Sequence, residues 1–214
     1  MVDSKLRFVL ASRSPRRREL LGLLVPPEQV DVVPPASPEE LDFEGLRTLP
    51  ELHQRLLLIA SHKADQVARQ IGDRSAQSVI VAADTTVIVS DPATGHPVAL
   101  GQPPETANWS ATVRDWFERY YAGRWHVVTT GLEVRVPRQQ PRHAVVETRV
   151  EFRPDVQRWL DWYLQTGESQ GKAGGYALQG AGSLFVARIE GSLTNVVGLP
   201  LESLAELLGI RPLG

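Results

Sequence analysis

The sequence contains no cysteine. This absence excludes disulfide bonds, thiolate nucleophiles and zinc sites built from cysteine. Long apolar segments are also missing, because runs such as residues 56–60 are far shorter than the ~18 residues that a membrane-spanning helix needs. Arg7 interrupts the segment that would have to be the apolar part of a signal peptide. We therefore expect a soluble, cytoplasmic protein with no membrane partner.

The sequence also lacks an excess of positive charge. Lys and Arg number 23 against 25 Asp and Glu, which gives a net charge of -2 and no general attraction to nucleic acid. The five histidines show neither HxH nor HExxH spacing, which argues against a histidine metal site. The GxSxG elbow, the GxxxxGK[ST] loop and the GxGxxG fingerprint are absent as well. Any basic site must therefore be local, and we expect no nucleic-acid partner.

What is present is enough apolar material for a folded core. The chain has 214 residues, of which 42% are hydrophobic, and we expect one domain over residues 1–214. The expected strands are residues 8–10, 30–33, 79–89, 125–136, 144–152 and 185–189. The expected helices begin at Pro15, Pro50, Glu105, Pro154 and Leu201. The pattern predicts a mixed α/β fold.

Residues 8–24, FVLASRSPRRRELLGLL, read as a buried strand, a tight loop and the start of a helix. Ser14 suits the N-cap and Pro15 the first helical position. Three arginines then follow in the first turn, where the helix dipole disfavours cations by up to ~1 kcal/mol each. Backbone N–H groups, serine hydroxyls and guanidinium groups together predict a phosphate-binding helix terminus. A solvated basic turn is the alternative.

Two charged residues fall within apolar patterns. Lys63 lies near the middle of the apolar stripe of the helix expected over residues 50–71, so it must either extend to solvent or meet an anion. Asp84 lies in the middle of VIVAADTTVIV, residues 79–89, a run typical of a strand covered on both faces. A buried carboxylate must pair, hold a metal or face a cleft. Asp84 is therefore the best catalytic candidate, although a structural ion pair would give the same pattern.

Two loops complete the set of candidates. In GKAGGYALQG, residues 171–180, glycines allow a close approach of the backbone to a ligand. Lys172 can meet a phosphate there, and Gln179 offers a donor and an acceptor to a base edge. The stretch could equally form only turns. The acidic loop over residues 34–50 contains Glu39 and Glu40, and either it is simply solvated or one glutamate contacts a metal or substrate.

Together these residues favour one kind of chemistry. The atypical residues are Ser12, Ser14, Arg16, Arg17, Lys63, Asp84 and Lys172, with Glu40 and Gln179 as possible additions. Basic groups suit a polyanion, and Mg²⁺ commonly binds through one or two carboxylates and the phosphates of its substrate. Metal-assisted attack of water on a phosphate chain is the simplest reaction that such groups allow. The sequence therefore predicts a nucleotide hydrolase.

The chain also resembles a known family through five motifs in order. They are LASRSPRRRELL (10–21), ASHKA (60–64), ADTTV (83–87), KAGGYALQG (172–180) and NVVGLPL (195–201). Motifs of this form and order resemble those of the Maf family of nucleoside triphosphate pyrophosphatases. The ADT and KAGxYxxQG forms resemble the branch acting on dTTP and UTP, rather than the branch acting on 7-methyl-GTP.

The resemblance implies an elongated twisted sheet flanked by helices, two lobes with a cleft between them, and a homodimer. It implies Mg²⁺- or Mn²⁺-dependent cleavage of a nucleoside triphosphate to a monophosphate and pyrophosphate, in a house-cleaning role. On this resemblance Asp84 is the proton acceptor near the metal, and Glu40 is the loop glutamate, with Glu39 as the alternative. The phosphate-side positions are Ser12, Arg16, Arg17, Lys63 and Lys172. The positions linked to base choice are Arg16, Thr85 and Gln179.

The sequence departs from the family pattern at two positions. Gln102 stands where the family often has Lys, and Gly171 stands where it often has Asp. The loss of a cation at Gln102, another substrate-binding position, weakens phosphate binding in principle. The resemblance also implies an association with inhibition of septum formation. Together with the missing cation, this makes a nucleotide-binding regulator of septum formation an alternative function, and a phosphatase that releases orthophosphate is a third.

Overall fold

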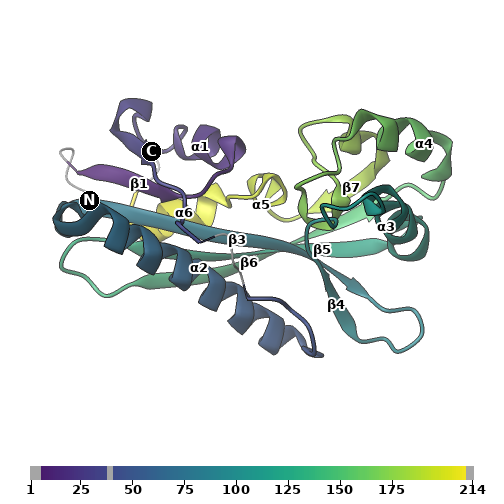
Figure 1. Cartoon of the computed structure of the whole chain (residues 1–214), viewed down its shortest axis with the longest axis horizontal. Coiled ribbons are helices and arrows are strands. Elements are labelled where there is room, and N and C mark those ends of the chain that lie inside the picture. The colour runs from purple at the N-terminus through teal and green to yellow at the C-terminus, as the bar shows by residue number, and fades with distance from the viewer. Residues whose placement is uncertain (1–5, 38–40, 211–214) are drawn as a thin grey trace.

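The computed structural model describes residues 6–37 and 41–210, and its centre is a long, twisted, seven-stranded sheet (Figure 1). The strands are β1 (Arg7–Ala11), β2 (Val30–Val32), β3 (Ser78–Ser90), β4 (Pro97–Leu100), β5 (Trp125–Arg135), β6 (Arg142–Phe152) and β7 (Val186–Glu190). Their order is β2-β1-β3-β5-β6-β7, and β4 pairs with β3 beside this path. The strand β1 is parallel to β2 and β3, and the other pairings are antiparallel. The expected mixed α/β fold with an elongated sheet is confirmed.

The strand β3 changes its neighbour halfway along its length. Its first residues pair with β1 as far as Ala82, and its last residues pair with β4 from Val87 onward. On the other edge, β5 pairs with β3 without interruption from Ile80 to Ile88. Residues 83–86 therefore have no strand beside them on the β1 and β4 edge within the described part of the chain. This gap opens the sheet where Asp84 lies.

Helices cover both faces of the sheet. They are α1 (Pro15–Leu21), α2 (Leu49–Ile71), α3 (Trp109–Trp116), α4 (Gln157–Thr166), α5 (Leu193–Val197) and α6 (Leu201–Leu208). Figure 1 shows α2 along one face and α1 on the other. Because successive strand residues point to opposite faces, Val9 joins the core beneath α2 while Phe8 joins the core with Leu20 of α1. A capping box between Thr48 and Glu51 fixes the start of α2.

A separate aromatic core lies at the other end of the sheet, under α3 and α4. Phe117 contacts four buried rings, those of Tyr121, Phe152, Tyr163 and Phe185, with ring centroids 4.9 to 5.7 Å apart. Edge-on and tilted ring pairs of this kind stabilise a core beyond the area that they bury. This aromatic core forms one of the two expected lobes, and the two cores on the faces of the sheet near β1 form the other.

Some predicted boundaries are wrong. The helix expected from Glu105 begins at Trp109, whose N–H donates to the Thr106 carbonyl in a preceding turn, and it ends in a π-helical turn over Phe117–Tyr121. The helix expected from Pro154 begins at Gln157, because residues 154–156 form a turn instead. Local pattern places helix starts poorly when a proline also suits a turn.

Among the described helices, none is both long and apolar enough to cross a lipid bilayer.

Candidate active site

A cleft of about 870 Å³ lies where β3 passes from β1 to β4. Its lining comes from the β1–α1 loop, α2, the middle of β3, residues 101–102, the glycine-rich segment and the end of α5. All ten described residues that the sequence singled out line it: Ser12, Ser14, Arg16, Arg17, Lys63, Asp84, Thr85, Gln102, Lys172 and Gln179. The remaining candidates, Glu39 and Glu40, lie outside the described residues. Segments far apart in the sequence thus meet at one place.

The first motif forms the expected helix start. The side chain of Ser14 accepts a hydrogen bond from the Arg17 N–H at 3.4 Å, and Pro15 occupies the first turn. The hydroxyl of Ser12 accepts a hydrogen bond from the Ser14 N–H at 3.1 Å, which shapes the loop before the helix. Ser12 and Ser14 therefore fix the loop before α1 and the N-terminal end of this helix beside the cleft.

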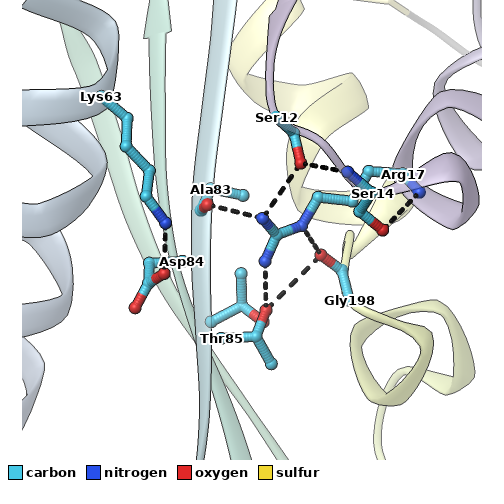
Figure 2. Close-up of polar contacts among 9 residues, drawn as sticks. Ser12, Ser14, Arg17, Lys63, Ala83, Asp84, Thr85 and Gly198 are labelled. Carbon is cyan, nitrogen blue, oxygen red and sulfur yellow. Dashed lines mark hydrogen bonds and ion pairs between the residues drawn. The ribbon is translucent and has the colours of Figure 1, made fainter. Parts of the chain in front are cut away.

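Arg17 binds the protein through several guanidinium N–H groups (Figure 2). Its Nε donates to the Gly198 carbonyl at 2.8 Å, Nη1 to the Ala83 carbonyl at 2.9 Å, and Nη2 to the Thr85 hydroxyl at 2.9 Å. A longer contact of 3.4 Å joins Nη1 to Ser12. The backbone of Gly198 has a φ of +121°, a conformation that other residues rarely adopt. Arg17 thus connects α1, β3 and the segment after α5, a role that the sequence did not predict.

Lys63 and Asp84 form an ion pair on the other side of β3 (Figure 2). Lys63 Nζ lies 2.6 Å from Asp84 Oδ1, and the two side chains are only 12% and 11% exposed. The ammonium group therefore meets an anion, which is one of the two outcomes expected from its place in the apolar stripe of α2. The pair fixes the orientation of the Asp84 carboxylate beside the cleft.

Arg16 and Lys172 also line the cleft. Partial burial lowers the pKa of Arg16, and the nearby Glu168 carboxylate opposes that shift. Burial also lowers the pKa of Lys172, with a further contribution from repulsion by Arg16, and Glu168 again opposes the change. A bound anion would stabilise the charged form of both side chains, because its negative charge would offset the hydration that they lose on burial. The electrostatics of this region favour a polyanionic ligand.

Two site residues emerge only from the structure. Glu105 lines the cleft, and the Glu168 carboxylate accepts hydrogen bonds from backbone N–H groups directly after the glycine-rich segment. Nothing in the local pattern singles out either residue. Their positions depend on how distant segments pack.

The oxygen donors of the cleft suit a divalent cation. Within the described residues no group of three His, Cys, Asp or Glu side chains could hold a metal alone. Asp84 and Glu105 are the carboxylates in the described lining. Mg²⁺ and Mn²⁺ prefer oxygen ligands, and Mg²⁺ usually takes few from the protein when a phosphate chain supplies the others. The donor set therefore fits a metal that arrives with a phosphorylated ligand.

The family model of the Maf-like proteins matches residues 7–210. The chain belongs to the Maf family. The dTTP/UTP pyrophosphatase of Syntrophus aciditrophicus is 36% identical over 203 residues, which cover 94% of this chain and 88% of that protein. The dTTP/UTP pyrophosphatase of Moorella thermoacetica is 37% identical over 205 residues, 95% and 94% of the two chains. A HAM1 protein from Coxiella burnetii aligns with a TM-score of 0.48 at 15% identity, covering 96% of this chain and all of that one.

Proposed function

We propose that this Maf family member hydrolyses nucleoside triphosphates, with dTTP, UTP and modified pyrimidine nucleotides as substrates, to a nucleoside monophosphate and pyrophosphate. One observation carries the proposal: residues from all five motifs converge on one cleft, where the Lys63–Asp84 pair lies near a group of further cations. The names of the Syntrophus and Moorella relatives support the choice of reaction and substrate.

In the proposed reaction the cations bind the phosphate chain. Arg16, Lys63 and Lys172 neutralise its charge, and Thr85, Arg16 and Gln179 contact the base. Asp84 accepts a proton from water, whose oxygen attacks the α-phosphorus. The bond from that phosphorus to the bridging oxygen breaks, pyrophosphate leaves, and the net reaction releases one proton. Positioning and charge stabilisation account for most of the catalysis of phosphoryl transfer.

We also propose that the reaction depends on Mg²⁺ or Mn²⁺. Asp84 and Glu105 are the described residues that would hold the ion, and Glu40 is a further expected ligand from the family resemblance. When bound, such an ion neutralises phosphate charge and stabilises the leaving group. Removal of divalent ions with EDTA should abolish turnover, and added Mg²⁺ or Mn²⁺ should restore it.

The remaining proposals concern the protein as a whole. We propose a single domain over residues 1–214 that acts in the cytoplasm as a homodimer. The absence of cysteine agrees with a reducing compartment. Light scattering coupled to size-exclusion chromatography tests the dimer, because a single peak with the mass of one chain would contradict it.

The decisive experiment resolves the products. Purified protein is incubated with Mg²⁺ or Mn²⁺ and a panel of canonical and modified triphosphates, and monophosphate, pyrophosphate and orthophosphate are measured separately. We expect pyrophosphate together with TMP or UMP, and Asp84→Asn should abolish both while nucleotide still binds. Orthophosphate with a nucleoside diphosphate would overturn the reaction. Binding without any product would favour the regulatory alternative.

A further inference from the structure

Glu168 binds the backbone directly after the glycine-rich segment. Its Oε2 accepts a hydrogen bond from the Ala181 N–H at 2.7 Å, and its Oε1 accepts one from the Gly182 N–H at 3.0 Å. Glu168 follows the C-terminal end of α4, where Gly167 adopts the left-handed conformation. Two backbone donors on one carboxylate form charge-assisted bonds, which are shorter and stronger than neutral ones.

Gly180 shows how closely the segment is packed on this carboxylate. Its φ and ψ of −132° and −153° are open to any residue, so its backbone does not require glycine. A Cβ atom at this position would nevertheless lie 2.2 Å from Oε2 of Glu168. Glycine at 180 is therefore explained by the approach of the carboxylate.

The backbone groups that Glu168 binds lie two and three residues after Gln179, which lines the cleft. Gln179 is exposed, lines the cleft and directly precedes Gly180. The earlier half of the segment has its own anchors, because Tyr121 donates to the Gly174 carbonyl at 2.9 Å and Tyr163 donates to the Gly175 carbonyl at 3.0 Å. Glu168 thus anchors the backbone just after Gln179, while two tyrosine hydroxyls anchor Gly174 and Gly175.

The charge of Glu168 also acts on the cleft. Its carboxylate opposes the lowering of the pKa of both Arg16 and Lys172, so it lies near enough to affect two cations of the lining. Glu168 itself does not belong to the described lining. It therefore influences a ligand through its charge and through the backbone that it holds, and not by direct contact.

We propose that Glu168 is a positioning residue that sets base discrimination by fixing the backbone that carries Gln179. The inference rests on the proposed function and extends it. A carboxamide has one donor side and one acceptor side, so it can match the N3–H and O4 of thymine or uracil. If it flips, it can match the N3 and N4 amino group of cytosine instead. The fixed backbone sets where this amide meets the base, and therefore which of the two pairings is favoured.

The test compares dTTP with dCTP in wild type and Glu168→Gln. The carboxamide keeps the shape but turns one acceptor into a donor, so one backbone bond is lost. We expect the ratio of kcat/KM for dTTP over dCTP to fall roughly fivefold to tenfold, as the loss of one hydrogen bond predicts. Pyrophosphate should inhibit the variant at least as strongly as it inhibits the wild type, because the substitution removes a negative charge. Glu206→Gln makes the same change at an exposed site on α6 and should leave the ratio unchanged.

Two further variants separate positioning from charge. Glu168→Asp keeps the charge but is too short to reach both N–H groups, so the ratio should fall as it does in Glu168→Gln. Gly180→Ala leaves Glu168 in the chain and pushes its carboxylate aside, and it should lower the ratio as well. Retention of the wild-type ratio by either variant would overturn the proposal. Gly180→Ala also serves as the test if Glu168→Gln does not fold.

A purely structural role gives a different result. The kcat/KM values for both nucleotides would then fall by the same factor, with a lower melting temperature, and the proposal would be wrong. Failure of the proposed function would be visible in the wild type, as absence of pyrophosphate from either nucleotide. In that case the ratio of dissociation constants for dTTP and dCTP replaces the kinetic ratio, and the same change in Glu168→Gln is expected.

Discussion

Arg16 and Arg17 are neighbours in one motif, yet the structure predicts that the same substitution destabilises the protein at Arg17 and leaves its stability almost unchanged at Arg16. Arg17→Lys keeps the positive charge but replaces a planar group of five donors by a single ammonium. Three short bonds, of 2.8, 2.9 and 2.9 Å, connect Arg17 to Gly198, Ala83 and Thr85. The acceptors surround the guanidinium group (Figure 2), so an ammonium can satisfy about one of them.

The magnitude follows from the number of bonds lost. A hydrogen bond to a charged group contributes about 1.5 to 3 kcal/mol, and the lower value suits a partly buried site. Loss of two bonds should therefore lower the free energy of unfolding by about 3 kcal/mol. With an m-value of about 2 kcal/mol/M, the urea midpoint should fall by roughly 1.5 M.

Urea unfolding followed by circular dichroism measures this change, with Arg16→Lys as the matched control. Arg16 points a half-buried cation at the cleft, and in the described structure its side chain makes no hydrogen bond to the protein. Its replacement by Lys should leave the midpoint within about 0.3 M of wild type, since surface changes usually alter stability by less than about 0.5 kcal/mol. Equal midpoints for the two variants would refute the assignment of Arg17 as a connector of the three segments.

Three other predictions concern the cleft and the buried histidine of the aromatic core. Gln102→Lys supplies the cation that the family often has at this exposed position, and it should lower KM for triphosphates roughly fivefold, or about 1 kcal/mol, in steady-state assays. Lys63→Met should lower kcat and destabilise the fold. The loss of stability should be less than the ~3–5 kcal/mol expected when a fully buried ion pair is broken, because water in the cleft can hydrate Asp84. Turnover assays measure the first effect and urea unfolding the second. Burial lowers the pKa of His126 to about 3, so between about pH 6.5 and 3 the unfolded state binds a proton that the native state does not. Stability should therefore fall as pH decreases through this window, by up to about 5 kcal/mol from this group, and His126→Gln should reduce the slope in urea unfolding at several pH values.

Much of the site could be predicted because its residues violate local patterns. Asp84 interrupts an apolar strand, Lys63 interrupts an apolar stripe, and the arginines oppose the dipole of α1. Each violation has an energetic cost, so each one predicts a partner or a ligand that offsets this cost. The structure supplies the partner for Asp84 and Lys63 in each other, 21 positions apart.

Other features could not be predicted from local pattern. Three consecutive arginines point about 100° apart around a helix, and only the packing of α1 decides which of them meets the Gly198 carbonyl, 181 positions away. Glu168 follows a helix end and looks like any surface glutamate until the segment over residues 177–182 folds onto it. Contacts of this range depend on tertiary structure, which neither periodicity nor propensity encodes.

The gap beside residues 83–86 of β3 explains why the ADTT segment contributes side chains to two sides of one cleft. Successive residues of a strand point to opposite faces, so Asp84 meets Lys63 of α2 while Thr85 meets Arg17 of α1 (Figure 2). A continuous sheet would keep these two environments apart, but residues 83–86 have no neighbour on the β1 and β4 edge within the described strands. A ligand lying across this open edge can contact both faces at once. A shift of one residue in the pairing of β3 with β5 would exchange the two side chains, so the register Asp84↔Gly131 places the carboxylate on the face where its ammonium partner lies.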